Sequence, residues 1–566
     1  MRMSRVAGAV LTLLVGLGLS GCRSTADTIF FGDNIVTMDP DQPTVEAVAV
    51  LGETIVAAGA RGDVMAFRGD ATRVVDLGDH ALLPGFIDSH SHYTGAGAEG
   101  LDLDPPPVGD VGSIDDLVRK VKQWIVDYNI PPGEIVSGGG YDDAVMKEGR
   151  HPTKFDLDRI STEHLIIVSH VSGHLRALNS AALEASNITA ATEDPPGGHI
   201  RRITGSMEPD GVLEETAGRL VVRRPSPPKT PEEEQAEFDA LVRRATQVYN
   251  GYGVTTIQLG GSTSPERIRA LRAVAAREPL NADVAVYSSA RGILDDSVRY
   301  ERTYTNGVRV AAVKMFLDGS PQGRTAWVTE PYVEGPPGAP ADYVSYPTME
   351  PDTLKALVTQ VIRKGVPVSV HCNGDAASDV FLDGVEEAIS GMDPKPDHRS
   401  VIIHAQIMRE DQMDRVARLG LVPSFFSSHV FFWGDWHRRS FGEERASNIS
   451  ATGWARDRGV RYTIHTDAMV VPPNMMRALS ITVNRKTRSG HVLGPHQRAT
   501  VMEALKALTI DAAYQYFEED TKGSITVGKQ ADLVILGENP LTADPAGLED
   551  IPIVETFSRG RSVYRR

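Results

Sequence analysis

The amino-acid sequence predicts an α/β fold, on three observations. Apolar segments of strand length recur eight times between residues 81 and 467, and most of the gaps between them carry an amphipathic helical pattern. Short alternating strands occur at both ends of the chain, and one gap between strands is far longer than the others. Strand–helix alternation repeated eight times is the pattern of a (β/α)8, or TIM, barrel. We therefore expect such a barrel, with a small composite β-sandwich domain from both termini and an insertion after barrel strand 1.

The composition is that of a folded globular protein with an acidic balance. Of the 566 residues, 41% are hydrophobic and 23% are charged. Lys and Arg number 58 against 75 Asp and Glu, a formal net charge of −17. No basic tract occurs, so we do not expect nucleic acid as a partner. Two cysteines exclude a disulfide scaffold, and Cys372, within an apolar strand, is interpreted as a small buried hydrophobe without a catalytic role.

Residues 1–22 resemble a bacterial lipoprotein signal peptide. Arg2 and Arg5 precede an apolar core from Val6 to Leu19 that is short for a membrane span. The segment ends Leu19-Ser-Gly-Cys22, which resembles the lipobox, where cleavage leaves a lipidated N-terminal cysteine. An ordinary signal peptide with a chance cysteine is the alternative. We expect an exported protein, anchored to a membrane through Cys22 on its periplasmic or extracellular face.

Both ends of the mature chain are predicted to form short strands of one small, antiparallel β domain, built from residues 26–80 and 520–566. This is feasible because the two ends of a closed barrel lie side by side. The expected strands are Thr28–Ile35, Ala47–Val50, Thr54–Ala58 and Arg73–Asp76, followed near the C-terminus by strands within 523–536 and Ile553–Tyr564.

The barrel is assigned to residues 81–519, with residues 95–230 as the insertion. Its expected strands are Ala81–Asp88, Val254–Leu259, Ala282–Ser288, Val308–Leu317, Val366–His371, Ser400–His404, Leu421–Phe426 and Arg461–Asp467. Its expected helices are Glu232–Tyr249, Pro265–Arg277, Thr353–Lys364, Ala376–Ile389 and Arg409–Leu419, with Thr500–Tyr516 as the closing helix.

Metal-competent side chains stand where several of these strands end. In barrels of this kind the chemistry lies at the carboxyl ends of the strands. Residues i and i+2 of a strand point to the same face, so the two histidines of a His-x-His pair can bind one metal ion. A buried polar side chain without a partner is expensive, and a shared metal removes that cost. Strands 2, 3 and 7 carry no equivalent residue. The candidates are His90 and His92 after strand 1, Lys314 in strand 4, and His371, His404 and Asp467 at the ends of strands 5, 6 and 8.

In their order and spacing these motifs resemble the amidohydrolase superfamily, and in particular its amidohydrolase-3-type branch of amide and N-formyl hydrolases. The resemblance covers nearly all of the mature chain. It rests on Pro-Gly-Phe-Ile-Asp-Ser-His-Ser-His ending at His92, Lys-x-x-x-x-Gly-Ser starting at Lys314, His371-Cys-Asn-Gly-Asp375, His404, Asp467 and Val-Gly-Lys-Gln-Ala-Asp-Leu ending at Leu533.

The resemblance implies a ligand set. His90, His92 and Asp467 would hold one metal, and His371 and His404 a second. Lys314 would be carbamylated, so that its new carboxylate bridges both ions. A salt-bridged Lys314 in a site with one metal is the alternative. The cofactor would be one or two divalent ions such as Zn²⁺.

The resemblance also implies the reaction, hydrolysis of the C–N bond of an amide, an N-acyl amine or an N-formyl amine. Such metals lower the pKa of bound water from about 15.7 to about 7. Asp467 could accept the water proton and deliver it to the leaving nitrogen. A deaminase or cyclic amidase would use the same site but release ammonia or a ring-opened acid. A non-catalytic, surface-anchored binding or regulatory protein is disfavoured, because every expected ligand position is filled. We expect a small-molecule substrate, and a homodimer is left open.

Two further segments are candidates for the substrate pocket. In the insertion, Val171-Ser-Gly-His174 precedes Asn179. The related branch has a similar Gly-His…Asn stretch that contributes to the substrate pocket, so the resemblance implies that His174 could polarise a substrate carbonyl; a structural histidine at a helix start is the alternative. Within the most aromatic stretch of the chain, four side chains could shape a pocket for a hydrophobic group or form a packing plug under the insertion. These are Phe426, His429, Trp433 and Trp436.

Three other histidines receive weaker assignments. His465 lies two residues before Asp467 and is expected to support the metal ligands from behind. His170 and His199, both inside the insertion, are left unassigned.

Overall fold

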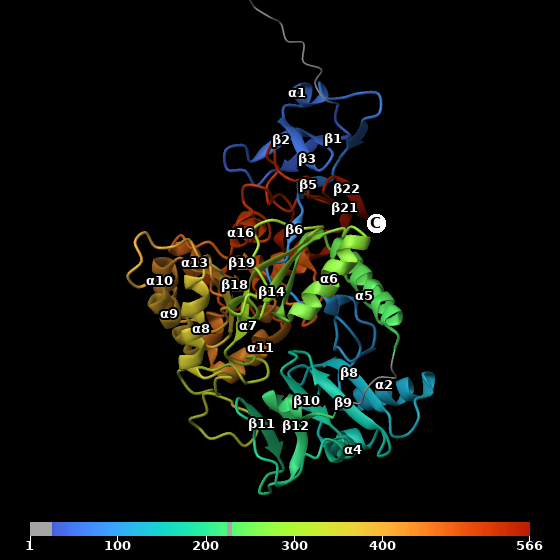
Figure 1. Cartoon of the computed structure of the whole chain (residues 1–566), viewed down its shortest axis with the longest axis vertical. Coiled ribbons are helices and arrows are strands. Elements are labelled where there is room, and N and C mark those ends of the chain that lie inside the picture. The colour runs from blue at the N-terminus through green and yellow to red at the C-terminus, as the bar shows by residue number, and fades with distance from the viewer. Residues whose placement is uncertain (1–24, 223–228) are drawn as a thin grey trace, which may run out of the picture.

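The computed structural model describes residues 25–222 and 229–566, so the predicted signal segment and Cys22 lie outside the described residues. Three parts follow one another along the long axis of the molecule (Figure 1): a β domain at one end, an α/β body in the middle and the insertion at the other end. Within the two described ranges, no helix has the length and apolar character needed to cross a membrane.

The middle part is a TIM-barrel-like α/β structure built on an eight-stranded parallel sheet, and each predicted barrel strand region contributes to it. The strand order follows the sequence, as expected when a helix connects each parallel strand to the next. The strands are β6 (Phe86–Ile87), β13 (Val254–Thr263), β14 (Asp283–Ser288), β15 (Val308–Phe316), β16 (Val368–Cys372), β17 (Val401–His404), β18 (Val422–Phe425) and β19 (Thr463–Ile464).

Two backbone hydrogen bonds join the segments that follow the first and last strands of this sheet. The amide of His92 donates to the carbonyl of Ala468 at 2.7 Å, and the amide of Asp467 donates to the carbonyl of His90 at 3.1 Å. Residues nearly 380 positions apart in the chain are therefore fixed against one another at the carboxyl ends of the strands.

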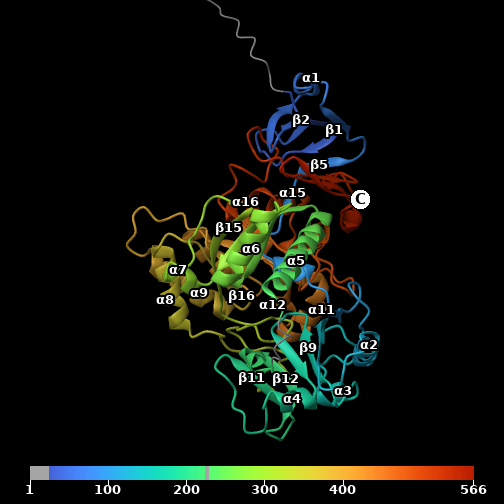
Figure 2. The same cartoon turned by 45° about the vertical axis from the view of Figure 1, so that its right-hand side comes forward.

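Helices follow most of the strands and surround the sheet (Figures 1 and 2). The first long one begins with a capping box between Thr230 and Glu233 and a proline in its first turn, which explains its sharp start. The helices are α5 (Pro231–Gly251), α6 (Pro265–Arg277), α7 (Ala290–Leu294), α8 (Pro351–Arg363), α9 (Asp375–Ile389), α10 (Glu410–Leu419), α11 (His429–Phe441), α12 (Glu443–Ser447), α13 (Thr452–Asp457), α14 (Met475–Asn484), η3 (Pro495–Gln497), α15 (Val501–Ala507) and α16 (Ile510–Gln515).

The closing helix predicted over Thr500–Tyr516 is wrong as one element, because the structure divides it into α15 and α16. The backbone leaves the helical region at Thr509, where φ is −135° and ψ is −93°. The Thr509 hydroxyl donates to the carbonyl of Leu505 at 2.7 Å, a side-chain bond that competes with regular helix geometry.

Strands from both ends of the chain share one sheet at the top of Figure 1, in the order β22-β21-β20-β5-β1-β2-β3, with β4 pairing β1. The expectation of a purely antiparallel sandwich is wrong in this respect, because β5 bridges β1 and β20 within a single sheet and β1 runs parallel to β4 and β5. The elements are β1 (Thr28–Val36), β2 (Thr44–Leu51), β3 (Thr54–Gly59), α1 (Arg61–Met65), β4 (Arg73–Asp76), β5 (Ala81–Pro84), β20 (Leu533–Leu536), η4 (Pro545–Asp550), β21 (Ile553–Ser558) and β22 (Arg561–Arg565).

The predicted strand Ala81–Asp88 is divided between two sheets at Gly85. β5 belongs to the β domain, whereas β6 pairs with β13 in the barrel-like sheet. A Cβ atom at Gly85 would lie 2.5 Å from the side chain of Thr255, so only glycine permits this close passage. Because the chain enters β6 from the β domain, the carboxyl ends of the parallel strands point away from that domain and towards the insertion.

The insertion forms a structure of its own, a six-stranded sheet in the order β11-β12-β10-β9-β8-β7. Its buried core includes Leu103, Leu117, Val136 and Val168. The elements are η1 (Tyr93–Gly97), β7 (Leu101–Asp102), α2 (Ile114–Asp127), β8 (Ile135–Tyr141), α3 (Lys154–Asp158), β9 (Leu165–His170), β10 (Leu175–Leu178), α4 (Ser180–Ala185), β11 (Gly198–Arg202), β12 (Pro209–Glu215) and η2 (Thr216–Leu220).

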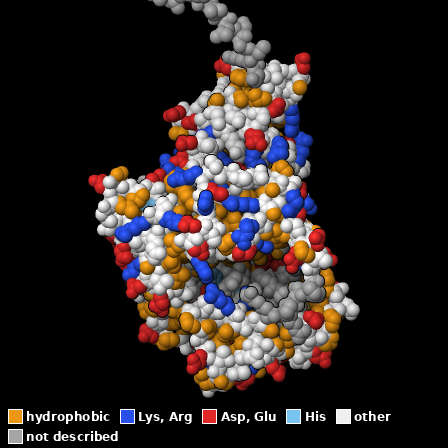
Figure 3. Space-filling view, viewed as in Figure 1, with side chains coloured by type: hydrophobic (Ala, Val, Ile, Leu, Met, Phe, Trp, Pro, Cys, Tyr) orange, Lys and Arg blue, Asp and Glu red, His pale blue; other side chains and the backbone are white. Residues whose placement is uncertain are grey.

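Charged side chains of both signs are mixed on the face of the molecule shown in Figure 3. Lys and Arg lie beside Asp and Glu over the middle part, without an extended area of one sign.

A buried ion cluster joins the β domain to the barrel-like sheet. Asp283, the first residue of β14, contacts Lys522 and Arg559, and Lys522 also contacts Glu518 at 3.2 Å. Burial acts to raise the pKa of Asp283, but the two cations outweigh it and lower this pKa to about 2.

Replacing Asp283 with asparagine would leave Lys522 and Arg559 buried without their shared carboxylate. We expect Asp283→Asn to lower the free energy of unfolding by about 3–5 kcal/mol at neutral pH, measured by denaturant titration. Since the folded pKa lies below the ordinary value, the contribution of Asp283 is complete above about pH 4 and is lost as the pH falls towards 2. The difference in the free energy of unfolding between Asp283→Asn and wild type should therefore become smaller as the pH falls over that range.

The matched control is Asp296→Asn, whose carboxylate is 72% exposed and pairs with Lys364 on the surface. This change should leave the stability nearly unaltered, because exposed ion pairs contribute little. Equal stability of Asp283→Asn and wild type at pH 7 would contradict the structural role of the cluster.

Candidate metal centre

His90, His92 and Asp467 form a compact group at the carboxyl ends of the parallel strands. Nε2 of His92 lies 3.2 Å from Oδ1 of Asp467, and Nε2 of His90 lies 3.5 Å from the same oxygen. In a tetrahedral zinc site with bonds of about 2.0 Å, ligand atoms lie about 3.3 Å apart. Oδ1 of Asp467 is buried and accepts no well-aligned hydrogen bond. The three side chains therefore fit one divalent cation.

Lys314, His371 and His404 complete the set that the sequence predicted. Nζ of Lys314 lies 3.4 Å from Nε2 of His90, and Nδ1 of His404 lies 4.0 Å from Oδ2 of Asp467. The rings of His371 and His404 are 4.5 Å apart between centroids. All six predicted ligands thus converge, although they come from five different strand regions.

Two of these residues adopt a backbone conformation that non-glycine residues rarely use. His404 has φ +75°, the following Ala405 has φ +47°, and Asp467 has φ +53°. Each such residue costs about 1–3 kcal/mol, a cost found where the surrounding structure fixes a functional side chain. The strain turns these side chains into the centre at the point where their strands end.

The electrostatics leave the ligands in the protonation states that metals require. Burial first, and then the charge of neighbouring groups, holds the pKa of His90, His371 and His404 well below its ordinary range, so the imidazoles are neutral. Burial also lowers the pKa of Lys314 to about 7. Burial acts to raise the pKa of Asp467, but His92 and His90 keep this pKa below its usual value, and the side chain remains a carboxylate.

Gln258 in β13 supports His90 and was missed in the sequence. Its Oε1 contacts Nδ1 of His90, and its Nε2 donates to the carbonyl of Ser89 at 2.8 Å and to the Tyr516 hydroxyl at 3.0 Å. The contact fixes the ring so that Nε2 faces Asp467. The one signal in the sequence was a polar amide inside an apolar strand that otherwise lacked a functional residue.

Asp318 supports His371 and was also missed. Its Oδ1 lies 3.0 Å from Nδ1 of His371, while its carboxylate accepts from the backbone amides of Asn373 and Gly374. Burial raises the pKa of Asp318 to about 7. The residue lies within the Lys314 motif, but its spacing alone did not reveal which histidine it would meet.

His465 lies behind His404, where it was expected. Its Nε2 is 3.1 Å from Nδ1 of His404, and its Nδ1 is 2.8 Å from the Ser424 hydroxyl. The same Nδ1 of His404 lies 4.0 Å from Oδ2 of Asp467. A chain of buried polar groups therefore runs from Ser424 through His465 to His404 at the edge of the centre and orients this ring.

His174 reaches the centre from the insertion. Its ring centroid lies 5.1 Å from that of His371, and its Nδ1 lies 2.7 Å from Oε2 of Glu215. Burial acts to lower the pKa of His174, but Glu215 outweighs it and raises the pKa. Glu215, which the sequence did not single out, thus favours the protonated form of a histidine beside the predicted metal ligands.

The four predicted aromatic-stretch residues are buried between the centre and the insertion. Phe426 stacks on His465 with 5.3 Å between ring centroids, and Nε1 of Trp433 donates to Asp142 at 2.7 Å. Trp436 donates to the carbonyl of Gln322, and His429 contacts His437. Their contact with a substrate stays a prediction, since each makes internal contacts that a packing role would also require.

Comparison with known proteins places these motifs in a wider context. Residues 73–564 match a family model described as "Amidohydrolase family". The chain is 27% identical over 547 residues to "Putative amidohydrolase YtcJ" of Bacillus subtilis (strain 168), covering 95% of this chain and 99% of that protein. It is 24% identical over 555 residues to "N-substituted formamide deformylase" of Arthrobacter pascens, covering 95% and 98%. An uncharacterized metal-dependent hydrolase from Pyrococcus furiosus shares the fold, with a TM-score of 0.66 at 24% identity over 91% of this chain and 100% of that one.

Gly260 offers a test of how tightly His90 is held. A Cβ atom at Gly260 would lie 2.4 Å from Oε1 of Gln258 and 2.5 Å from the ring of His90, so Gly260→Ala must displace one of them. We expect a loss of about 10- to 100-fold in metal affinity, as for other changes behind a ligand. The measurement is metal retained per chain during dialysis against graded chelator.

The neighbouring Gly261 provides the control, since an added Cβ atom there would meet nothing within 4 Å. Gly261→Ala should keep the wild-type metal affinity. An unchanged affinity of Gly260→Ala, in protein with wild-type circular dichroism, would contradict the tight packing of His90.

Proposed function

The chain belongs to the amidohydrolase family and is a metal-dependent hydrolase, and from this premise we propose that it hydrolyses the C–N bond of an amide, an N-acyl amine or an N-formyl amine. The observation that carries the proposal is the group of His90, His92 and Asp467, with Lys314, His371 and His404 beside it. The similarity along nearly the whole chain to an N-substituted formamide deformylase supports this class of substrate.

The donor set fits one or two divalent ions of the zinc type. His90, His92 and Asp467 would hold the first, and His371 and His404 the second. When bound, such ions would polarise the scissile carbonyl and lower the pKa of water towards about 7. Neutral imidazoles and a carboxylate are the ligands that zinc prefers.

Asp467 is suited to move the proton. Its Oδ1 has no well-aligned hydrogen bond, and its carboxylate stays ionised among the imidazoles. We assign it as the group that accepts the proton of the attacking water and then delivers this proton to the leaving nitrogen. One carboxylate can perform both steps because each occurs at the same position in the site.

His174 is suited to hold the substrate. The Glu215 carboxylate fixes its Nδ1, so that a protonated ring has Nε2 as its second donor. We assign it to donate a hydrogen bond to the substrate carbonyl oxygen, where negative charge develops during attack. The aromatic-stretch residues would border the group attached to that carbonyl or nitrogen.

Lys314 is proposed to carry a carbamate. Its buried Nζ lies among the ligands, where an ammonium would repel two cations. A neutral amine adds to CO₂, forms an N–C bond and loses one proton, which yields a bridging carboxylate. Mass analysis at neutral pH should find the mass of one added CO₂ on the peptide that contains Lys314. Metal analysis of the same protein should find two ions per chain. A bare Lys314 with one ion would leave the hydrolase with a single-metal site.

Two expectations about the whole chain are also proposals. The hydrogen bonds between the His90–His92 and Asp467–Ala468 segments support closure of the sheet as a (β/α)8 barrel. The Leu19–Cys22 sequence supports export and anchoring of the protein at a membrane by a lipid on Cys22. Labelling with a fatty-acid analogue that is lost in Cys22→Ser would test the anchor.

The reaction is tested by supplying N-formyl and N-acyl amines to the metal-loaded protein and identifying the products. A free amine together with a carboxylic acid is expected. Ammonia would instead identify a deaminase, and a ring-opened acid from a cyclic amide would identify a cyclic amidase. Removal of metal by a chelator should abolish turnover, and added zinc should restore it.

The role of Asp467 is tested with Asp467→Asn. The amide retains a ligand oxygen but no longer accepts a proton, so kcat should fall by about 100- to 10,000-fold. Asp352→Asn, at a carboxylate that is 95% exposed on α8, serves as the control and should keep wild-type turnover. Wild-type kcat in a metal-loaded Asp467→Asn protein would overturn the assignment.

A further inference from the structure

The insertion contains a second group of metal-competent side chains, away from the predicted barrel ligands. Asp143, His151 and His170 offer ligand atoms that all lie within 4.8 Å of one another, and all three side chains are buried. Nε2 of His170 lies 3.1 Å from Oδ1 of Asp143, and Nε2 of His151 lies 3.4 Å from Oδ2. These separations match the distance of about 3.3 Å between ligand atoms of a tetrahedral zinc site.

Like the barrel centre, this group forms where neighbouring parallel strands end. β8 and β9 are parallel neighbours, and Tyr141 at the end of β8 pairs with His170 at the end of β9. Asp143 lies two residues after the end of β8, so the carboxyl ends of two parallel strands bring a carboxylate and an imidazole to one edge of the sheet. His151 reaches the same place from the loop before α3.

The second nitrogen of each imidazole has a hydroxyl partner. Nδ1 of His151 lies 3.1 Å from the Tyr141 hydroxyl, and Nδ1 of His170 lies 2.8 Å from the Ser172 hydroxyl. The Tyr141 hydroxyl can accept from Nδ1 of His151, which leaves the lone pair of that Nε2 free beside Asp143. Nδ1 of His170 accepts from the Ser172 backbone amide at 3.3 Å and its Nε2 contacts Asp143, so binding of a cation would move the ring proton to Nδ1, where the Ser172 hydroxyl can accept it. Metal-binding histidines are held in this way by a partner on the far nitrogen.

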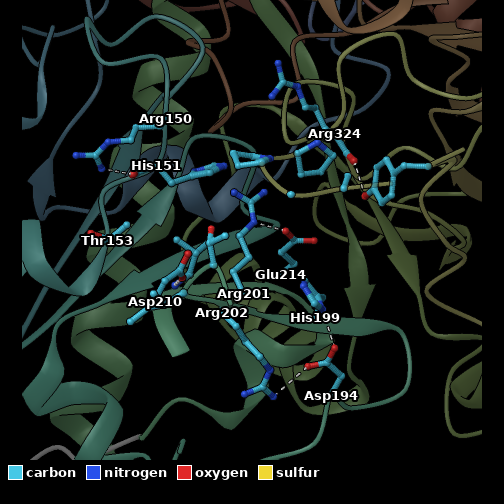
Figure 4. A pocket seen from close by; sticks show the side chains of 18 of the residues that line it. Arg150, His151, Thr153, Asp194, His199, Arg201, Arg202, Asp210, Glu214 and Arg324 are labelled. Carbon is cyan, nitrogen blue, oxygen red and sulfur yellow. Dashed lines mark hydrogen bonds and ion pairs between the residues drawn. The ribbon is translucent and has the colours of Figure 1, made fainter. Parts of the chain in front are cut away.

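The group borders a large cavity. Asp143 and His151 line this cavity, which has a volume of about 1110 Å³ and lies between the insertion and the loop that contains Pro340 and Tyr343. Figure 4 shows His151 on its wall, near Arg201 and Arg324. A cation could enter through the cavity, and a ligand in the cavity could reach it.

The cations nearest to the group are already paired. Arg201 contacts Glu214, as Figure 4 shows, and Arg324 lies 2.6 Å from Glu334. Asp142, next to Asp143 in the chain, adds a second buried carboxylate 3.9 Å from Nε2 of His170. Because a carboxylate neutralises each of these two guanidinium groups, their positive charge does not exclude a cation from the site.

We propose that Asp143, His151 and His170 form a second cation site, for Zn²⁺ or a similar first-row divalent metal. Two imidazoles and a carboxylate suit such ions, and three protein ligands leave a coordination position open. This position would take an oxygen ligand, such as a carboxylate, presented from the cavity. The site is independent of the reaction proposed for the barrel centre.

The first experiment measures zinc per chain in full-length protein whose barrel centre is disabled by His90→Gln and His371→Gln. After incubation with zinc and gel filtration, we expect one ion per chain to remain. Adding His151→Gln should remove it. Adding His199→Gln, at a half-exposed histidine that lines the same cavity, should not.

Absence of zinc from the folded barrel-disabled protein would overturn the site and leave Asp143, His151 and His170 as a hydrogen-bonded network only. Retention of the ion in the His151→Gln protein would overturn it as well. Neither result bears on the barrel centre, whose metal and hydrolytic activity are measured on the unmodified chain.

A second experiment uses the unmodified chain, so its outcome does not depend on whether a variant folds. Crystals of the unmodified chain grown with zinc should give an anomalous difference peak at the zinc edge between Asp143, His151 and His170, in addition to any peak at the barrel centre. A map with density at the barrel centre alone would overturn the proposal.

Discussion

The buried carboxylate of Asp467 is the constraint on which the candidate centre depends. It sits within 3.5 Å of two imidazole nitrogens, on a backbone with φ +53°, and its amide is bonded to the carbonyl of His90. A charged group in this position is tolerable only where opposite charge accompanies it. The same arrangement includes the hydrogen bonds between the first and last strand regions, the strained backbone at His404 and the lowered pKa of Lys314. A cation bound here would neutralise the negative charge of Asp467.

Three of the predicted ligands are each held by a different buried polar group. Gln258 orients His90, Asp318 orients His371, and His465 orients His404. All three supporting groups are buried and make further hydrogen bonds of their own, so they cannot rotate freely. The orientation of these three imidazoles therefore depends on residues outside the predicted ligand set.

The insertion completes the centre as well as covering it. It supplies His174, whose Nδ1 contacts Glu215, and it packs against the aromatic stretch through the hydrogen bond from Trp433 to Asp142. The same six-stranded sheet brings Asp143, His151 and His170 together on the wall of a large cavity. The residues of this segment and the predicted ligands at the strand ends lie on separate sheets, so one set can vary in sequence without changing the other.

The sequence by itself predicted the strand–helix alternation, the strand-rich ends and the six side chains that the structure brings together, because apolar periodicity and polar residues at strand ends are local signals. The metal-binding roles of these side chains came from the family resemblance and stay predictions. Only the tertiary structure decided how these parts meet. The division of residues 81–88 between two sheets at Gly85, the break of the closing helix at Thr509 and the parallel pairing of β1 were not visible in local pattern. The same holds for Gln258, Asp318 and Glu215, and for the grouping of His170 with Asp143 and His151. A single polar residue in an apolar segment has no recognisable partner in sequence, since hydrogen-bond partners are chosen by contacts between strands far apart in the chain.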